Sequence, residues 1–284
     1  MVLPAAMPVT AKQQFARMRG GAQAQLMWAS DGHYYIVKFQ NNPQHRRVLA
    51  NEMVAHMLLK HLELPVPDWA IVEVPPELVA NCAQLYIEAG GRRQPCASGL
   101  QFGSRYPGDP ARLVVWDYVP DELLRQVTNV DCFVGMVVFD KWVSNADGRQ
   151  AIFFQDRAAR WRPAAAGGDP QQRGFVAAMI DHGFAFTAQR WTFRDAPTLG
   201  VYPRHWVYQG VTGYDSFGRW LERVGQLNSL VLDDALKQVP VEWYGDDQAE
   251  LERLLEQLYG RRRLVPDLLR AAKNALQDPF PNWR

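Results

Sequence analysis

The chain has 284 residues, 48% of them hydrophobic, so it can bury a large core as one bilobal unit or as two small domains. Its formal net charge of +1 offers no overall basic field, and we predict no direct binding to nucleic acid. Its 3 cysteines are too few and too scattered for a disulfide framework or a zinc site, which indicates a reducing, cytoplasmic compartment.

The first residues of the chain carry no recognisable targeting signal. Residues 1–8 are apolar but short and interrupted by prolines, and they lack the basic beginning and the long apolar centre of a secretion signal. No later run of the sequence approaches the ~18 apolar residues needed to span a bilayer. We therefore expect a soluble protein without a membrane partner, in which residues 1–18 form an N-terminal extension.

A β-hairpin is predicted over residues 23–39. Two stretches of strand-forming residues flank Asp31-Gly32, a good signal for a two-residue turn. Before the hairpin lies a loop of small residues, whose backbone amides could approach a phosphate closely. This loop consists of Gly20, Gly21, Ala22 and Gln23. A pair of glycines alone more often marks an ordinary flexible turn, so the loop gains weight only from the features that follow it.

Lys38 lies late in the second strand of this hairpin, where a lysine is most often just an exposed strand residue. The segment after Lys38 favours a functional role for this lysine. Residues 46–62 have helical periodicity with an apolar stripe, and they carry Glu52 in a mostly apolar neighbourhood. A small-residue loop, a strand, a turn, a strand with lysine and a helix with glutamate follow one another in protein-kinase-like nucleotide lobes. In those lobes the lysine holds the α- and β-phosphates, and the glutamate pairs with it.

The middle of the chain is less informative. Residues 69–74 and 113–118 predict two further strands. Between them, residues 88–112 are rich in Gly, Arg, Pro and Ser and predict a long loop, in which residues 99–105 could be a mobile flap or a substrate loop.

A cluster of polar residues follows the apolar helix or buried segment predicted for residues 130–142. Asp147 lies in this cluster, and the strand-like residues 151–154 come soon after it. A second strand-like run, residues 175–180, ends on Asp181. Two acids at the edges of one hairpin suit metal-bound phosphate chemistry, although acids that only cap turns would give the same pattern.

The surroundings of these acids lead to two further expectations. Asp140 is predicted to be a solvent-exposed acid at the end of the apolar helix, and His182 is predicted to be a packed or hydrogen-bonded turn residue rather than a metal ligand. Residues 217–236, 246–259 and 265–276 predict helices that only build the rest of the C-terminal part.

In this order, the features resemble the HipA-like kinase family, which is distantly related to protein kinases and phosphatidylinositol kinases. The segments that carry the resemblance are 20–23, 34–40, 51–52, 64–67, 139–150 and 180–186. The resemblance implies an α+β, bilobal protein-kinase-like fold. A small β-rich N-lobe, residues 19–120, would bind the nucleotide, and a mainly helical C-lobe, residues 121–284, would carry the catalytic and metal-binding loops.

The resemblance also implies the chemistry: an ATP- and Mg²⁺-dependent kinase that transfers the γ-phosphate to a hydroxyl acceptor, with protein serine or threonine expected. Lys38 would contact the phosphates and act in catalysis, and Glu52 would orient it. Asp147 would accept the proton of the substrate hydroxyl, and Asp181 would hold the metal. The other nucleotide contacts would come from the loop Gly20, Gly21, Ala22 and Gln23 and from a hinge assigned by position alone to Trp116, Asp117 and Tyr118. By analogy with the toxin–antitoxin arrangements of related proteins, a regulatory partner protein is also expected.

Two departures from the family pattern keep an alternative open. Kinase catalytic loops usually carry a metal-binding asparagine five residues after the base, but here that residue is Ile152, which cannot ligate Mg²⁺. We assign Gln150 as the substitute metal ligand, although its offset differs. Met18 and Arg19 stand where some relatives carry a phosphorylatable serine, so autophosphorylation of the loop is not expected. The alternative is a nucleotide-binding pseudokinase that acts as a regulatory or partner-binding module.

Overall fold

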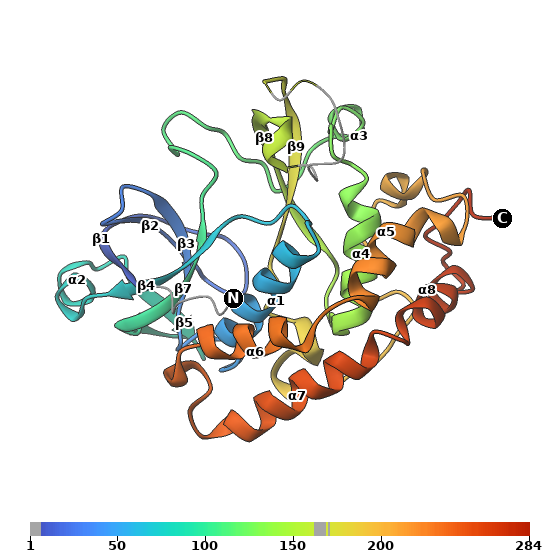
Figure 1. The fold of residues 1–284 in the computed structure, drawn as a ribbon. Helices are drawn as coiled ribbons and strands as arrows, with labels where there is room; N and C mark the ends of the chain where they lie inside the picture. Colours follow the sequence, from blue (N-terminus) through green and yellow to red (C-terminus); the bar gives the residue numbers. More distant parts are fainter. Residues whose placement is uncertain (1–6, 162–168, 170) are drawn as a thin grey trace.

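A computed structural model describes residues 7–161, 169 and 171–284 of the chain. Its N-terminal part forms a β-barrel, drawn in blue to green in Figure 1, and its C-terminal part is mainly helical. Helix α1 (Val48–His61) lies between these two parts in the view of Figure 1. The predicted α+β fold, β-rich first and helical later, is confirmed.

Five strands form the barrel. They are β1 (Val9–Arg17), β2 (Gln25–Ala29), β3 (Tyr34–Lys38), β4 (Trp69–Val74) and β7 (Gly99–Arg105). The barrel closes in the order β1-β2-β3-β7-β4, with β1 parallel to β4 and all other neighbours antiparallel. Since successive side chains of a strand point to opposite faces, each strand sends alternate residues into a small apolar core, among them Met27, Val37 and Val72.

The predicted hairpin and the first of the two later strands are confirmed. β2 and β3 pair antiparallel around the turn at residues 30–33, and β4 has the predicted bounds. Asp31 stabilises the turn, because its carboxylate accepts hydrogen bonds from the backbone N–H of His33 (3.1 Å) and the hydroxyl of Tyr35 (2.7 Å). The hairpin therefore brings Lys38 to the end of a barrel strand.

Strand β1 lies within the stretch that the sequence predicted to be an N-terminal extension. Residues 1–6 of that stretch lie outside the described residues, but Val9–Arg17 pairs with β2 and β4. Of this strand only Ala11 is buried, so its sequence lacks the apolar alternation by which strands are recognised. The β-rich part therefore begins at Val9 and not at residue 19.

The long loop predicted for residues 88–112 is wrong for most of its length. Its first residues belong to a small hairpin, β5 (Tyr86–Ala89) with β6 (Arg92–Pro95), and residues 99–105 form β7, which pairs with β3 and β4 in the barrel. Gly103 reads as a loop residue, but a Cβ atom built there would lie 2.5 Å from Cγ2 of Val72 on the neighbouring strand. The glycine is there because two strands pack closely, so residues 99–105 are a barrel strand and neither a mobile flap nor a substrate loop.

Helix α1 is confirmed, with bounds inside the predicted range 46–62. The second strand predicted after it, residues 113–118, does not form. Only Trp116 makes an isolated bridge, to Phe153, and the rest of the stretch is irregular. Apolar residues there pack sideways onto the β8–β9 hairpin described next, so their apolar character does not depend on a ladder of strand hydrogen bonds.

The C-terminal part begins with a two-stranded sheet and a central helix. β8 (Gln150–Arg157) and β9 (Arg173–Ile180) pair antiparallel, as predicted. Every residue of α4 (Cys132–Val143) is buried, which confirms the predicted buried helix. The surrounding helices are α3 (Asp121–Leu124), α5 (Gly218–Gly225), α6 (Ser229–Gln238), α7 (Gln248–Arg261) and α8 (Val265–Lys273), and α2 (Pro76–Asn81) lies beside the barrel. In the described part of the chain, no helix is long and apolar enough to cross a membrane.

Short 3-10 turns connect these elements. Their bounds are Ala158–Trp161, Ala185–Arg190, His205–Tyr208, Tyr214–Phe217, Val241–Trp243 and Gly245–Asp247. The turn at Ala185–Arg190 continues the segment after Asp181, and it packs against α1. This contact joins α1, the helix between the two parts, to the segment that follows Asp181.

Candidate active site

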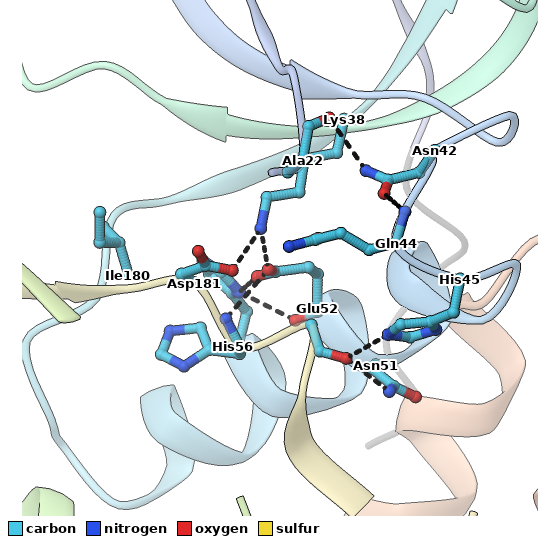
Figure 2. A network of polar contacts seen from close by, with 12 residues as sticks. Ala22, Lys38, Asn42, Gln44, His45, Asn51, Glu52, His56, Ile180 and Asp181 are labelled. Carbon is cyan, nitrogen blue, oxygen red and sulfur yellow. Dashed lines mark hydrogen bonds and ion pairs between the residues drawn. The ribbon is translucent and has the colours of Figure 1, made fainter. Parts of the chain in front are cut away.

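Lys38 joins two acids that come from different parts of the fold. Its Nζ forms an ion pair with Glu52 on α1 and lies 2.8 Å from Oδ1 of Asp181, the residue directly after β9 (Figure 2). Lys38 is 8% exposed and Glu52 is 1% exposed, so the pair lies away from bulk water. The structure therefore brings together three residues that lie up to 143 positions apart in the sequence.

Both acids stabilise the charge of Lys38, whereas burial and the neighbouring carboxylate of Asp181 raise the pKa of Glu52. Burial alone would lower the pKa of Lys38, but the carboxylates of Glu52 and Asp181 outweigh burial and raise the pKa above its ordinary value. Burial likewise opposes ionisation of Asp181, but Lys38 and Arg149 lower its pKa. Lys38 is thus a cation and Asp181 an anion at neutral pH, which is the state that phosphate and metal binding require.

Glu52 also fixes the backbone after Asp181. Its Oε1 accepts a hydrogen bond of 2.9 Å from the backbone N–H of His182. Asp181 itself has a positive φ of 59°, a left-handed conformation that aspartate tolerates better than most residues. One glutamate on α1 therefore holds both the lysine and the turn that carries the aspartate.

A buried ion pair supports the loop that carries Asp147. Asp140 and Arg149 are 1% and 2% exposed, and Nε of Arg149 donates to Oδ2 of Asp140 at 2.9 Å. The prediction that Asp140 faces solvent is therefore wrong. Its position at the helix end suggested an exposed acid, but an arginine nine residues later folds back onto it.

Asn145 and Arg149 connect this ion pair to both acids of the site. Asn145 donates to Asp140 (3.0 Å) and accepts from the backbone N–H of Asp147 (3.2 Å). Arg149 also donates to the carbonyl of Ile180 (2.8 Å) and contacts Nδ1 of His182 at 3.1 Å. The loop of Asp147 and the turn of Asp181 are thus tied to one buried centre, a role for Arg149 that no sequence pattern indicated.

His182 lies inside this centre and not at its surface. It is 0% exposed, which confirms the expected packed turn residue. Burial, followed by the positive charge of Arg149, lowers the pKa of its imidazole well below the ordinary value, so the ring is neutral.

A cavity of about 580 Å³ opens between the barrel and the C-terminal part, a volume in the range of small-molecule sites. Its lining contains Lys38, Glu52, Asp147, Gln150 and Asp181. Of the predicted glycine-rich loop, Gly20, Gly21 and Ala22 take part as well. Apolar walls are provided by Ile36, Phe102, Val115, Ile152 and Ile180. The structure therefore gathers most of the predicted site residues around one space.

Three predicted nucleotide contacts lie outside the lining. The backbone N–H and carbonyl of Trp116 are both bonded to Phe153 (2.9 and 2.8 Å), and Tyr118 is 65% exposed. Gln23 turns its side chain to Arg17 and to the backbone of Glu88. Asp117 does line the cavity, so it is the hinge residue closest to the expected role.

The metal site implied by the sequence would rest on Asp181 and Gln150. The side chain of Asp181 is 22% exposed, and a hydrogen bond from Gln150 helps to lower its pKa. Within the described ranges, no group of three or more His, Cys, Asp and Glu residues is arranged to hold a metal ion. Mg²⁺ usually needs only one or two carboxylates, because waters and substrate phosphates complete its octahedron. The residues present therefore fit an ion that arrives with a nucleotide.

Ile152 has a structural role in place of the expected metal ligand. It pairs with Ala178 in the hairpin, and its side chain packs with the apolar cluster around Leu113 and Val115. It forms part of the apolar wall of the cavity.

The model of the HipA-like kinase family matches residues 15–264. The chain belongs to the HipA-like kinase family. No curated protein matches the chain. Among solved structures it is similar to CtkA, a proinflammatory kinase of Helicobacter pylori, with a TM-score of 0.53, 12% identity, and coverage of 96% of this chain and 100% of that one. It is also similar to a Golgi casein kinase with Mn/ADP bound, with a TM-score of 0.47, 9% identity, and coverage of 96% and 74%.

Family membership confirms the resemblance drawn from the sequence, and the likeness to CtkA confirms the kinase-like fold. Together they support a kinase-type phosphotransferase.

Proposed function

We propose that this HipA-like kinase uses ATP and Mg²⁺ to phosphorylate a hydroxyl acceptor, with a protein serine or threonine as the expected acceptor. The observation that carries the proposal is the position of Lys38, which is paired with Glu52 and Asp181 at one cavity together with the glycine-rich loop and Asp147. Phosphoryl transfer needs a cation at the phosphates, a carboxylate for the metal and an acceptor for the hydroxyl proton, and this cavity contains all three.

Lys38 and Glu52 would position the nucleotide. The buried carboxylate of Glu52 keeps the lysine charged and aims its Nζ into the cavity, so little reorganisation is needed when phosphates bind. Gly20 and Gly21 line the same space, and because they have no side chains of their own, their backbone can approach a phosphate closely. Mg²⁺ held by Asp181 and Gln150 would neutralise the negative charge of the phosphates.

Asp147 would act as the base. Its side chain is exposed at the cavity, and among the residues that the structure describes its Oδ1 accepts only the backbone N–H of the next residue, Gly148, at 2.7 Å. The second carboxylate oxygen can take the proton of the acceptor hydroxyl as that oxygen bonds to the γ-phosphorus, while ADP leaves with the electrons of the broken bond. The Asp140–Arg149 pair holds the loop in this position through Asn145.

A nucleotide-binding pseudokinase is the second candidate, and Ile152 at the position of the usual second metal ligand favours it. The protein acceptor, the regulatory partner protein and the cytoplasmic location remain predictions from the sequence.

Transfer of labelled γ-phosphate separates the two candidates. The intact protein is incubated with labelled ATP and either MgCl₂ or EDTA, with dephosphorylated casein and myelin basic protein as acceptors. The kinase proposal predicts Mg²⁺-dependent label on protein and its loss in Asp147→Asn. Binding of ATP without any transfer to protein or water would favour the pseudokinase, and failure of the wild type to bind ATP would refute both.

A further inference from the structure

The loop between β3 and α1 sends one polar side chain into the cavity, and none of the kinase motifs contains it. This side chain is Gln44, which extends toward Lys38 and Asp181 in Figure 2 and lines the cavity with them. Its Oε1 is buried and has no hydrogen-bond partner within the described part of the chain. A buried carboxamide oxygen without a partner costs free energy, and only a hydrogen-bond donor can satisfy it, whereas the NH₂ group of the same side chain can donate to acceptor atoms of a ligand.

We propose that Gln44 binds the terminal phosphates of the nucleotide beside Lys38. The proposal rests on the proposed function in one respect, namely that the ligand of the cavity is ATP. A carboxamide is suited to this role because its NH₂ group donates to phosphate oxygens while its oxygen can accept from a backbone N–H of the glycine-rich loop. Gln44 carries no charge, so it needs no counter-ion while the cavity is free of ligand.

The backbone of this loop is held in place on both sides. Asn42 donates from Nδ2 to the carbonyl of Ala22 in the glycine-rich loop (3.1 Å), and its Oδ1 accepts the backbone N–H of Gln44 (2.8 Å). Nε2 of His45 lies 2.9 Å from the carbonyl of Gly183, in the segment after Asp181. Gln44 therefore lies between the glycine-rich loop, expected to cover the phosphates, and the turn after β9, expected to hold the metal. Contacts on both sides preorganise its position.

The glycine-rich loop is shaped to admit this side chain. A Cβ atom built on Gly21 would lie 3.1 Å from Nε2 of Gln44, closer than an ordinary contact. The carboxamide thus lies directly against bare backbone, at the place where glycine amides would meet phosphate oxygens. Gln44 and the loop would enclose the same phosphate groups from two sides.

Isothermal titration with Mg²⁺-ATP and with AMP tests the proposal. Because hydrogen bonds to charged groups are the stronger ones, Gln44→Ala should bind ATP about tenfold more weakly than the wild type. Its affinity for AMP, which lacks the terminal phosphates, should change by less than about twofold. Gln44→Glu places a like charge beside the phosphates, and it should bind ATP more weakly than Gln44→Ala.

Gln84→Ala is the matched control, because Gln84 is an exposed glutamine outside the cavity lining, and it should bind both nucleotides as the wild type does. Equal ATP affinity of wild type and Gln44→Ala would overturn the role of Gln44 and leave the proposed function intact. An equal loss for ATP and AMP would also overturn it, since it would indicate a purely structural role. A wild type that binds no ATP would overturn the proposed function and this inference together.

Discussion

The buried pair of Asp140 and Arg149 allows a stability prediction with a defined size. The two side chains are 0% and 1% exposed, so Arg149→Met would leave the carboxylate of Asp140 buried without its counter-charge. Removal of one partner of a buried pair typically costs about 3–5 kcal/mol. The hydrogen bonds to the carbonyl of Ile180 and to His182 would be lost as well, so we expect a loss of at least ~3 kcal/mol and a thermal midpoint lower by ~10 °C.

Thermal and urea unfolding followed by circular dichroism measure this loss. Arg263→Met is the matched control, because Arg263 is exposed, and it should change stability by less than about 0.5 kcal/mol. In the double variant Asp140→Asn with Arg149→Met neither position of the pair carries a charge, so its loss of stability should be at least about 1 kcal/mol smaller than the sum of the losses in the two single variants. A loss below about 1 kcal/mol in Arg149→Met, or strict additivity in the double variant, would refute the reasoning.

Three further predictions concern the polar residues around the site. Burial lowers the pKa of His56 to about 3, so between pH ~6.5 and pH ~3 the unfolded chain binds a proton that the folded chain does not, and His56 alone should reduce stability by about 2 kcal/mol between pH 7 and pH 5. Urea midpoints at the two pH values check this, and the drop should be smaller in His56→Gln. Asn51 donates to the carbonyls of Gly183, Ala185 and Ala188 at 2.8 to 3.0 Å, so Asn51→Ala should lower the free energy of unfolding by ~2–3 kcal/mol. The loosened segment should then be cleaved faster by trypsin after the exposed Arg190, and an unchanged cleavage rate would contradict this prediction. Lys38→Met removes the only cation that bridges Glu52 and Asp181 among the described residues, and ATP affinity by titration should fall at least ~10-fold, whereas equal affinity would place the phosphates elsewhere.

The parts of the site that the sequence predicted are those defined by residue type and order. Lys38, Glu52, Asp147 and Asp181 are the kinds of residue that phosphoryl transfer requires, and the hairpin and helix between them follow from hydrophobic periodicity. All four line one cavity, so the order of these residue types along the chain was enough to predict that they lie together.

What could not be predicted depends on contacts between distant segments. An aspartate at a helix end looks the same whether it faces water or an arginine, so the buried pair of Asp140 and Arg149 left no signal. Gly103 is a residue typical of loops, and only the close approach of a neighbouring strand explains the glycine there. Strand β1 was missed because it is mostly exposed and lacks apolar alternation. Gln44 and Asn42 lie in an ordinary polar loop, and only the cavity and the backbone of Ala22 reveal their positions.

We propose that this cavity binds ATP and a metal ion between Lys38 and Asp181. A crystal structure of the protein with Mg²⁺ and a non-hydrolysable ATP analogue tests it most directly. We predict phosphate density between the glycine-rich loop and Nζ of Lys38, and a metal ion coordinated by the carboxylate of Asp181 and by phosphate oxygens. Nucleotide bound away from Lys38, or a metal ion that does not contact Asp181, would contradict the account.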